Sequence, residues 1–191
     1  MHHIIQRPNA ARVLVAIVVV IGSASGMSAQ SKAQSDKCKG VPFDVEFVKN
    51  KSRAQVILQK TPDSQLVATT SSEPLQRILL VALMLKHEVE VQYSDPDPGD
   101  NLPKLTAVTL DLNPKKDEGR VFKLSLDEKN KYEAVVFSKG KGAIGWTNSP
   151  QMQAVLETAA RESIPVRNFS VDKGTMEILT AQVLIPLAKK K

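Results

Sequence analysis

The chain has few of the residues that most often carry out chemistry. Its 191 residues include one cysteine, Cys38, and three histidines, two of which are the second and third residues. A single cysteine cannot close a disulfide within the chain, so the fold must be held by burial of its core. His87 is the one histidine in the rest of the sequence, which leaves a metal site or a serine–histidine–aspartate triad without the partners it needs. We expect no metal, no other cofactor and no enzymatic activity.

Aromatic side chains are also scarce, at 4% of the chain with a single tryptophan. Proteins that bind single-stranded nucleic acid present exposed aromatic rings among basic residues. Here Phe43, Phe47, Phe122 and Tyr93 alternate with polar residues, so we expect these rings to face a core. The formal net charge of +6 is mild, and the sequence predicts no nucleic-acid partner.

Long apolar runs are absent as well. The longest covers residues 13–21 (VLVAIVVVI), and nine residues in a helix reach about 14 Å, less than half of a bilayer core. Arg7 and Arg12 precede this run and mostly small residues follow it at 22–29, which is the order of a secretory signal. The sequence predicts a signal peptide over residues 1–29, a periplasmic or secreted protein, and no membrane span after cleavage. An uncleaved anchor is the alternative.

One stretch of the sequence occurs twice. Residues 146–170 match residues 69–93 when read 77 positions later, so that Trp146 meets Thr69. Both copies carry apolar residues at i, i+3, i+4, i+7 and i+8, the stripe of an amphipathic helix. The stripe consists of Leu75, Ile78, Leu79, Ala82 and Leu83 in the first copy and of Met152, Val155, Leu156, Ala159 and Ala160 in the second. The match predicts two domains of one kind in tandem.

Each copy lies in a similar succession of elements. Alternating residues predict strands at 43–47, 54–59, 65–70, 88–93 and 105–112, with a helix from Ser71 or Ser72 to Lys86. The later series predicts strands at 120–126, 132–137, 143–147, 164–171 and 176–187, with a helix at 150–162. The expected domains are 41–114 and 119–188, after a flexible leader at 30–40. The apolar phase slips between Val166 and Phe169, which predicts a β-bulge there.

The order β-β-β-α-β-β is that of an OB-fold. The fold class we predict is mainly β with two helices, arranged as two tandem OB-like β-β-β-α-β-β units. A helix packed across an open antiparallel sheet would have the same order.

The chain also resembles a known family. Residues 82–93 (ALMLKHEVEVQY) run from the end of the first helix into the next strand and are followed by Leu105, Thr106, Ala107 and Val108. This pattern is similar to that of the pentameric B subunits of AB5 toxins, especially the subtilase-cytotoxin type. The resemblance implies an OB-fold in each unit and recognition of a glycan.

The single tryptophan lies where the third strand of the second unit meets the helix. Trp146 could seal the end of the barrel, or it could stack on a sugar ring with Thr147 and Asn148 as polar neighbours. These three residues are the candidate ligand-binding residues.

The two helices differ on a second face. Leu80, Val81, Met84 and Leu85 in the first helix correspond to Glu157, Thr158, Arg161 and Glu162 in the second. A helix that is apolar nearly all round must be covered on more than one side. We predict that Leu80, Val81, Met84 and Leu85 form an interface, packed against the second unit or against another copy in a homo-oligomer.

These features together predict a non-enzymatic, exported binding or adaptor protein that recognises a glycan or an envelope protein. The alternative is a structural, self-assembling module of the cell envelope.

Overall fold

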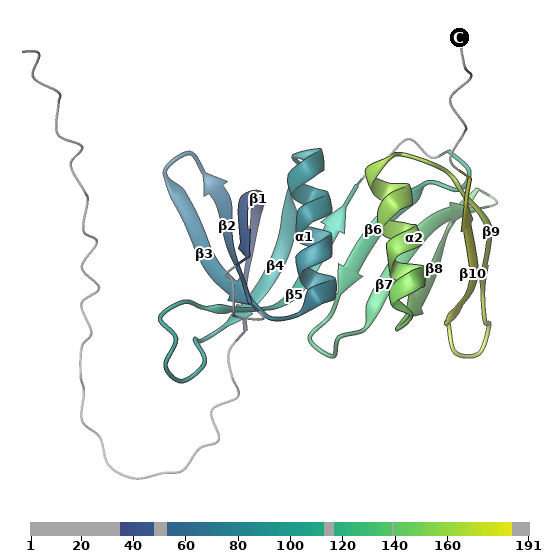
Figure 1. Ribbon diagram of the computed structural model, residues 1–191. Coiled ribbons are helices and arrows are strands. Elements are labelled where there is room, and N and C mark those ends of the chain that lie inside the picture. The colour runs from purple at the N-terminus through teal and green to yellow at the C-terminus, as the bar shows by residue number, and fades with distance from the viewer. Residues whose placement is uncertain (1–34, 48–52, 113–116, 139, 185–191) are drawn as a thin grey trace, which may run out of the picture. The chain divides into compact units, whose positions relative to one another are not determined.

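The computed structural model describes residues 35–47, 53–112, 117–138 and 140–184. All of them belong to one compact unit, Lys32–Lys191. The predicted signal peptide lies outside the described residues. The order of elements is β-β-β-α-β-β, twice over (Figure 1).

The first half forms a five-stranded, barrel-like sheet with one helix. Its elements are β1 (Asp36–Phe47), β2 (Ala54–Thr61), β3 (Ser64–Thr70), α1 (Glu73–Leu85), β4 (Val89–Ser94) and β5 (Lys104–Asp111). The strands lie in the order β3-β2-β1-β4-β5, and a parallel pairing of Thr69 with Lys104 closes the ring. The long strand β1 serves two neighbours, because residues 36–40 pair with β4 and residues 41–47 with β2.

The second half repeats this order. Its elements are β6 (Val121–Leu126), β7 (Tyr132–Ser138), β8 (Lys141–Thr147), α2 (Pro150–Arg161), β9 (Val166–Val171) and β10 (Ile178–Val183). Antiparallel pairing of β5 with β6 carries the sheet of the first half on into β6, β7 and β8, while β9 and β10 form a two-stranded sheet. A parallel bridge joins Trp146 of β8 to Glu177, the residue just before β10. The predicted fold class, mainly β with two helices in two tandem OB-like units, is confirmed.

The two halves agree down to single hydrogen bonds. β8 and β9 have the bounds of β3 and β4, shifted by 77 residues. Each helix follows an N-cap serine, Ser72 or Ser149, whose N–H donates to the hydroxyl of the threonine two residues earlier, at 3.2 and 3.1 Å. Each helix is followed by a left-handed residue, Lys86 with φ 54° and Ser163 with φ 52°. The backbone hydrogen bond before each helix and the left-handed reversal after it are therefore the same in both halves, and they direct each helix into the strand that follows.

The β-bulge expected in the second half is confirmed. Relative to β10, β9 has an extra residue between Arg167 and Ser170. Asn168, within this segment, has a φ of 50°. The slip in the apolar phase therefore reflects a real break in the ladder.

A second bulge, in β1, was not predicted and changes what faces the core. The register of β1 against β2 shifts between Pro42 and Asp44, so that Phe43 is the extra residue. Phe43 and Phe47 are 49% and 56% exposed, and the expectation that both rings face a core is wrong. The bulge inverts the alternation at Phe43, whereas Phe47 is the last residue of β1, two positions beyond the half-buried Val45.

The strands also extend beyond the apolar pattern. β1 begins at Asp36, so part of the expected flexible leader is a strand. Cys38 pairs there with Val91 and is half-buried. A polar segment can form a strand when a neighbouring edge supplies its backbone hydrogen bonds, which do not depend on side chains. The expected boundary between the domains lies beside the pairing of β5 with β6, so the halves share one sheet.

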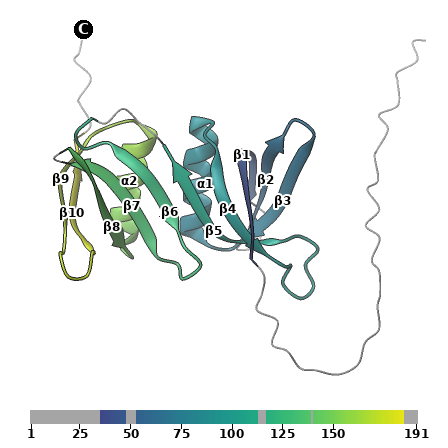
Figure 2. The same cartoon turned by 180° about the vertical axis from the view of Figure 1, so that it is seen from behind.

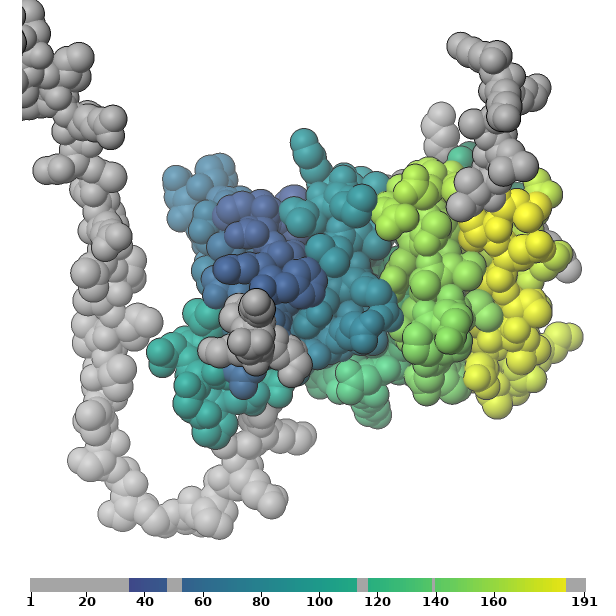
Figure 3. Space-filling model, in the orientation of Figure 1, coloured from purple at the N-terminus to yellow at the C-terminus, as the bar shows by residue number. Residues whose placement is uncertain are grey.

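One hydrophobic cluster runs through both halves. Its largest fully buried side chains are Tyr132, Leu58, Leu75, Ile78, Leu79, Leu110, Leu124, Leu126 and Leu156. Each buried aliphatic side chain contributes about 1.5–3 kcal/mol. The two helices lie side by side (Figures 1 and 3), and the view from behind shows β6, β7 and β8 in front of α2 (Figure 2).

Candidate binding sites

Trp146 lies on the outer face of β8. Its neighbours Gly145 and Thr147 are buried, and a Cβ on Gly145 would come within 2.6 Å of the Ile178 side chain. Side chains alternate between the faces of a strand, so Trp146 and Ile144 point outward. Ile144 is 50% exposed and Trp146 is half-buried.

The indole ring of Trp146 is held from two sides. Its Nε1–H donates to the carbonyl oxygen of Thr175 at 2.7 Å. The Lys131 ammonium lies 5.4 Å from the ring centroid and 3.5 Å from a carboxylate oxygen of Glu133, the residue opposite Trp146 in β7. The ring is therefore fixed in orientation and surrounded by charged groups that can donate and accept hydrogen bonds.

Thr147 and Asn148 have different surroundings, although the sequence placed them in one site with Trp146. Thr147 is 2% exposed, and its hydroxyl accepts the Ser149 N–H at 3.1 Å. Its carbonyl accepts a hydrogen bond from the Gln153 side chain at 3.4 Å. Asn148 is exposed. A ligand on the outer face can reach Trp146 and Asn148, whereas Thr147 is buried and serves the start of α2.

The first half has a hollow where the second half has the indole ring. The Thr69 N–H donates to the carbonyl oxygen of Pro103 at 2.9 Å, just as the Trp146 N–H donates to that of Met176 at 3.0 Å. Beside Thr69 lies a cavity of about 280 Å³. Its polar lining residues include Arg53, Gln55, Asp100 and Asn101.

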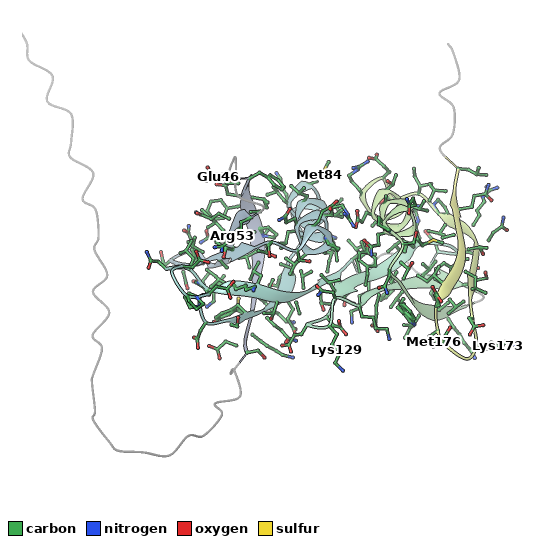
Figure 4. The ribbon with its side chains drawn as sticks, turned by 60° about the horizontal axis from the view of Figure 1, so that its bottom comes forward. Glu46, Arg53, Met84, Lys129, Lys173 and Met176 are labelled. Atoms are coloured by element: carbon green, nitrogen blue, oxygen red, sulfur yellow. The ribbon has the colours of Figure 1, made fainter. Side chains whose placement is uncertain are left out.

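Two of the residues that line this hollow form an ion pair. Arg53 pairs with Asp100, which ties the loop between β4 and β5 to the start of β2 (Figure 4 labels Arg53). The cavity offers a guanidinium, two amides and a hydroxyl, a set suited to a small polar ligand. The sequence patterns did not predict this hollow, although the replacement of Thr69 by Trp146 in the second copy was a signal of it.

A buried polar network joins the two helices. The Arg77 Nε–H of α1 donates to both carboxylate oxygens of Glu157 of α2, at 3.2 and 3.1 Å. The same guanidinium donates to Gln153 of α2 and, at 2.7 Å, to Glu73 of its own helix. Glu157 is 8% exposed. The network fixes α1 against α2, with Glu157 as its buried member.

Tyr132 lies beneath this network with no exposed surface. Its hydroxyl has no well-formed hydrogen bond among the described residues. Burial and the nearby Glu157 carboxylate raise the pKa of Tyr132 well above its ordinary value. Burial also raises the pKa of Glu157, against the opposing effect of Arg77. These shifts follow from the mostly buried contact between the two helices.

The predicted interface residues have mixed surroundings. Val81 is 5% exposed, and Leu80 and Leu85 are half-buried. α1 packs against α2 and β6, so the second half covers part of this flank. Met84 is 62% exposed and projects outward from α1 (Figure 4). An interface through Met84 stays a prediction.

Among the described residues, no group of three or more histidine, cysteine, aspartate or glutamate side chains could hold a metal ion. No helix in the described part of the chain has both the length and the apolar character needed to cross a membrane. No family model, curated protein or solved structure matches the chain.

Proposed function

We propose that this chain is a non-enzymatic, exported protein that binds a glycan at Trp146. The observation that carries the proposal is an outward-facing indole ring whose Nε1–H is fixed to the Thr175 carbonyl, with Lys131 and Glu133 beside it. A sugar has apolar faces and a rim of hydroxyl groups, so it suits an aromatic ring bordered by hydrogen-bonding groups. The resemblance of residues 82–93 to AB5 toxin B subunits supports the same function.

The ligand would displace the Lys131 ammonium from the ring. Lysine has a long, flexible stem, and Lys131 is half-buried in the turn just before β7, so this rearrangement needs no change in the backbone. Asn148 is exposed next to the start of α2 and adds an amide at the edge of the site.

The intrinsic fluorescence of the protein tests this proposal directly, because Trp146 is the one tryptophan of the chain. A glycan array of the full-length exported protein identifies sugars, and titration with those sugars should change the Trp146 emission. Trp146→Ala should abolish array binding. Trp146→Phe keeps a ring without the Nε1–H and should retain part of it.

Phe169→Ala serves as the matched control, because it removes a half-buried aromatic ring from β9 of the same half. Its array profile should equal that of the wild type, with circular dichroism confirming that each variant is folded. An empty array, or a profile unchanged in Trp146→Ala, would refute glycan binding at this residue.

A second candidate function is self-assembly into a structural module of the envelope. Met84 of α1 and Phe43 and Phe47 of β1 are all exposed, and these two elements pack against each other. Light scattering after size exclusion tests it. Assembly of the wild type that is lost in Met84→Glu, and retained in the surface control Lys173→Glu, would favour self-assembly; a monomer at high concentration would exclude it.

A further inference from the structure

The outer face of the long sheet carries one unbroken row of side chains that ends at Trp146. The pairings along this row are Glu90 of β4 with Thr109 of β5, Thr109 with Ser125 of β6, Ser125 with Glu133 of β7, and Glu133 with Trp146 of β8. Each of these residues lies between two buried residues of its own strand, so its side chain points away from the core. The row crosses from the first half into the second where β5 pairs with β6.

The side chains of this row remain within reach of a ligand. All five are half-buried, which leaves each with part of its surface exposed. Figure 2 views the molecule from this side, with β6, β7 and β8 in front of α2. The row is therefore a surface on which a ligand can lie, and the Trp146 ring is one end of it.

The row extends well beyond the indole ring. Neighbouring strands are about 4.8 Å apart, so Trp146 in β8 and Thr109 in β5 are separated by about 14 Å along the sheet. A single sugar ring on Trp146 cannot reach Thr109, whereas a short chain of sugars can. The length of the row therefore fits an oligosaccharide.

The row also has the chemistry that binds hydroxyl groups. Glu90 and Glu133 carry carboxylates, which accept hydrogen bonds. Thr109 and Ser125 lie between them and carry hydroxyls, which both donate and accept. A chain of sugars presents hydroxyl groups along its whole length, so each ring would find a partner on the strand beneath it.

The charges on this face balance. Three acidic residues each have a lysine beside them: the Lys39 ammonium lies 3.8 Å from a Glu90 carboxylate oxygen, the Lys131 ammonium lies 3.5 Å from a Glu133 carboxylate oxygen, and Lys123 is opposite Asp111 in the next row. A charged ligand would gain little from such a surface and would compete with ion pairs that are already formed. The face therefore favours an uncharged ligand.

We propose that this row binds an uncharged oligosaccharide, which lies across the strands with one sugar ring on Trp146 and later rings over Ser125 and Thr109. The proposal rests on glycan binding at Trp146 and adds the class of glycan, a neutral chain of several sugars. One ligand would then contact both halves, because the pairing of β5 with β6 makes the row continuous.

A glycan array separates this proposal from the function on which it rests. The array carries glucose, mannose, galactose and N-acetylglucosamine, each as a single sugar and as chains of two to six rings, with hyaluronan and sialylated chains as the acidic glycans. For the full-length exported protein, neutral chains should bind, and a six-ring chain should bind at least about tenfold more tightly than its single sugar, since several hydrogen bonds are added.

The other outcomes overturn the proposal. Binding that does not strengthen with chain length, or acidic chains that bind as tightly as neutral ones, would overturn it and leave glycan binding at Trp146 intact. An array without any binding would overturn both.

Two variants test the path over β6 and β5. Thr109→Val and Ser125→Ala each remove one hydroxyl far from the indole ring, and each should weaken binding of the six-ring chain about two- to tenfold, the effect of one hydrogen bond. Binding of the single sugar should not change. Thr61→Val is the matched control, since it makes the same change as Thr109→Val at an exposed position of β2 outside the row, and it should leave both affinities unchanged. If both variants, shown to be folded by circular dichroism, bind the six-ring chain as tightly as the wild type, the proposal is overturned.

Discussion

Removal of the Arg77 guanidinium is expected to weaken the contact between the two helices. The Glu157 side chain is 10% exposed, and Arg77 donates to both of its oxygens. The variant Arg77→Ala leaves a buried carboxylate without its cation. Breaking a buried pair in this way typically costs 3–5 kcal/mol, and because the Arg77 side chain is itself 24% exposed we expect a loss of about 3 kcal/mol in the free energy of unfolding at pH 8.

The loss should shrink as the pH falls. Burial raises the pKa of Glu157 and Arg77 opposes this rise, so the pKa climbs further in Arg77→Ala. A carboxyl group whose pKa is higher in the folded state takes up a proton more readily there than in the unfolded chain. The stability that protonated Glu157 adds is fully present below its pKa in the unfolded chain, about 4.3, and it is lost as the pH rises through its pKa in the folded protein. Arg77→Ala should therefore lie closer to the wild type at pH 5 than at pH 8.

Urea denaturation at the two pH values, followed by Trp146 fluorescence and circular dichroism, measures both effects. Arg161→Ala is the control, because its ion pair with Glu162 is on the surface, with side chains 40% and 51% exposed, and should change stability by less than about 1 kcal/mol. The double variant Arg77→Met with Glu157→Met should recover most of the stability, since it removes the buried charge altogether. An equal loss in Arg77→Ala at pH 5 and pH 8 would refute the assignment to ionised Glu157.

Three further predictions concern single positions. Gly119→Ala should lower the free energy of unfolding by about 2–4 kcal/mol, because its Cβ would lie 2.5 Å from the Val166 carbonyl oxygen at a φ of +79°. Gly140→Ala, at a similar φ of +76° but with open space around the Cβ, should cost only about 1 kcal/mol. Equal losses for the two variants in thermal denaturation would contradict this. Ser149→Ala should cost about 1 kcal/mol by removing the hydroxyl that accepts the Met152 N–H, whereas Ser72→Ala should cost less, since the Ser72 side chain makes no such cap; chemical denaturation of the pair decides. Burial raises the pKa of the Cys38 thiol, so its reaction with a thiol reagent at pH 8 should be slower in the folded protein than in urea, and equal rates would show that the thiol is exposed.

The sequence was most informative where periodicity and caps agree. The repeated helix stripe located both helices, and of the two serines expected to begin the first helix the structure has Ser72 as the N-cap. The slip near Phe169 led to a bulge because β9 is otherwise a regular alternation. Local patterns of this kind predict the structure well because each depends on residues only a few positions apart.

What the sequence could not supply depended on distant partners. Residues 36–40 form a strand because β4 offers them an edge, and their own composition is polar. The exposure of Phe43 depends on a bulge whose cause lies in the pairing with β2. The salt bridge of Arg77 with Glu157 joins residues 80 positions apart, and nothing in either local sequence indicates it.

The candidate site was predicted in part. An outward Trp146 follows from the alternation in β8, yet the burial of Thr147 follows from that same alternation and was overlooked. The hollow beside Thr69 is recognised only when the two halves are compared, because the Trp146 ring lies at the equivalent place in the second half.

The antiparallel ladder between β5 and β6 has a practical consequence for handling the protein. A chain divided between residues 112 and 117 would give two fragments, each with a bare row of amide and carbonyl groups and with part of the shared apolar cluster opened to water. Each fragment would supply the strand edge and the apolar surface that the other lacks. Dividing the chain here would therefore give two complementary fragments whose association can be induced by tethering them together.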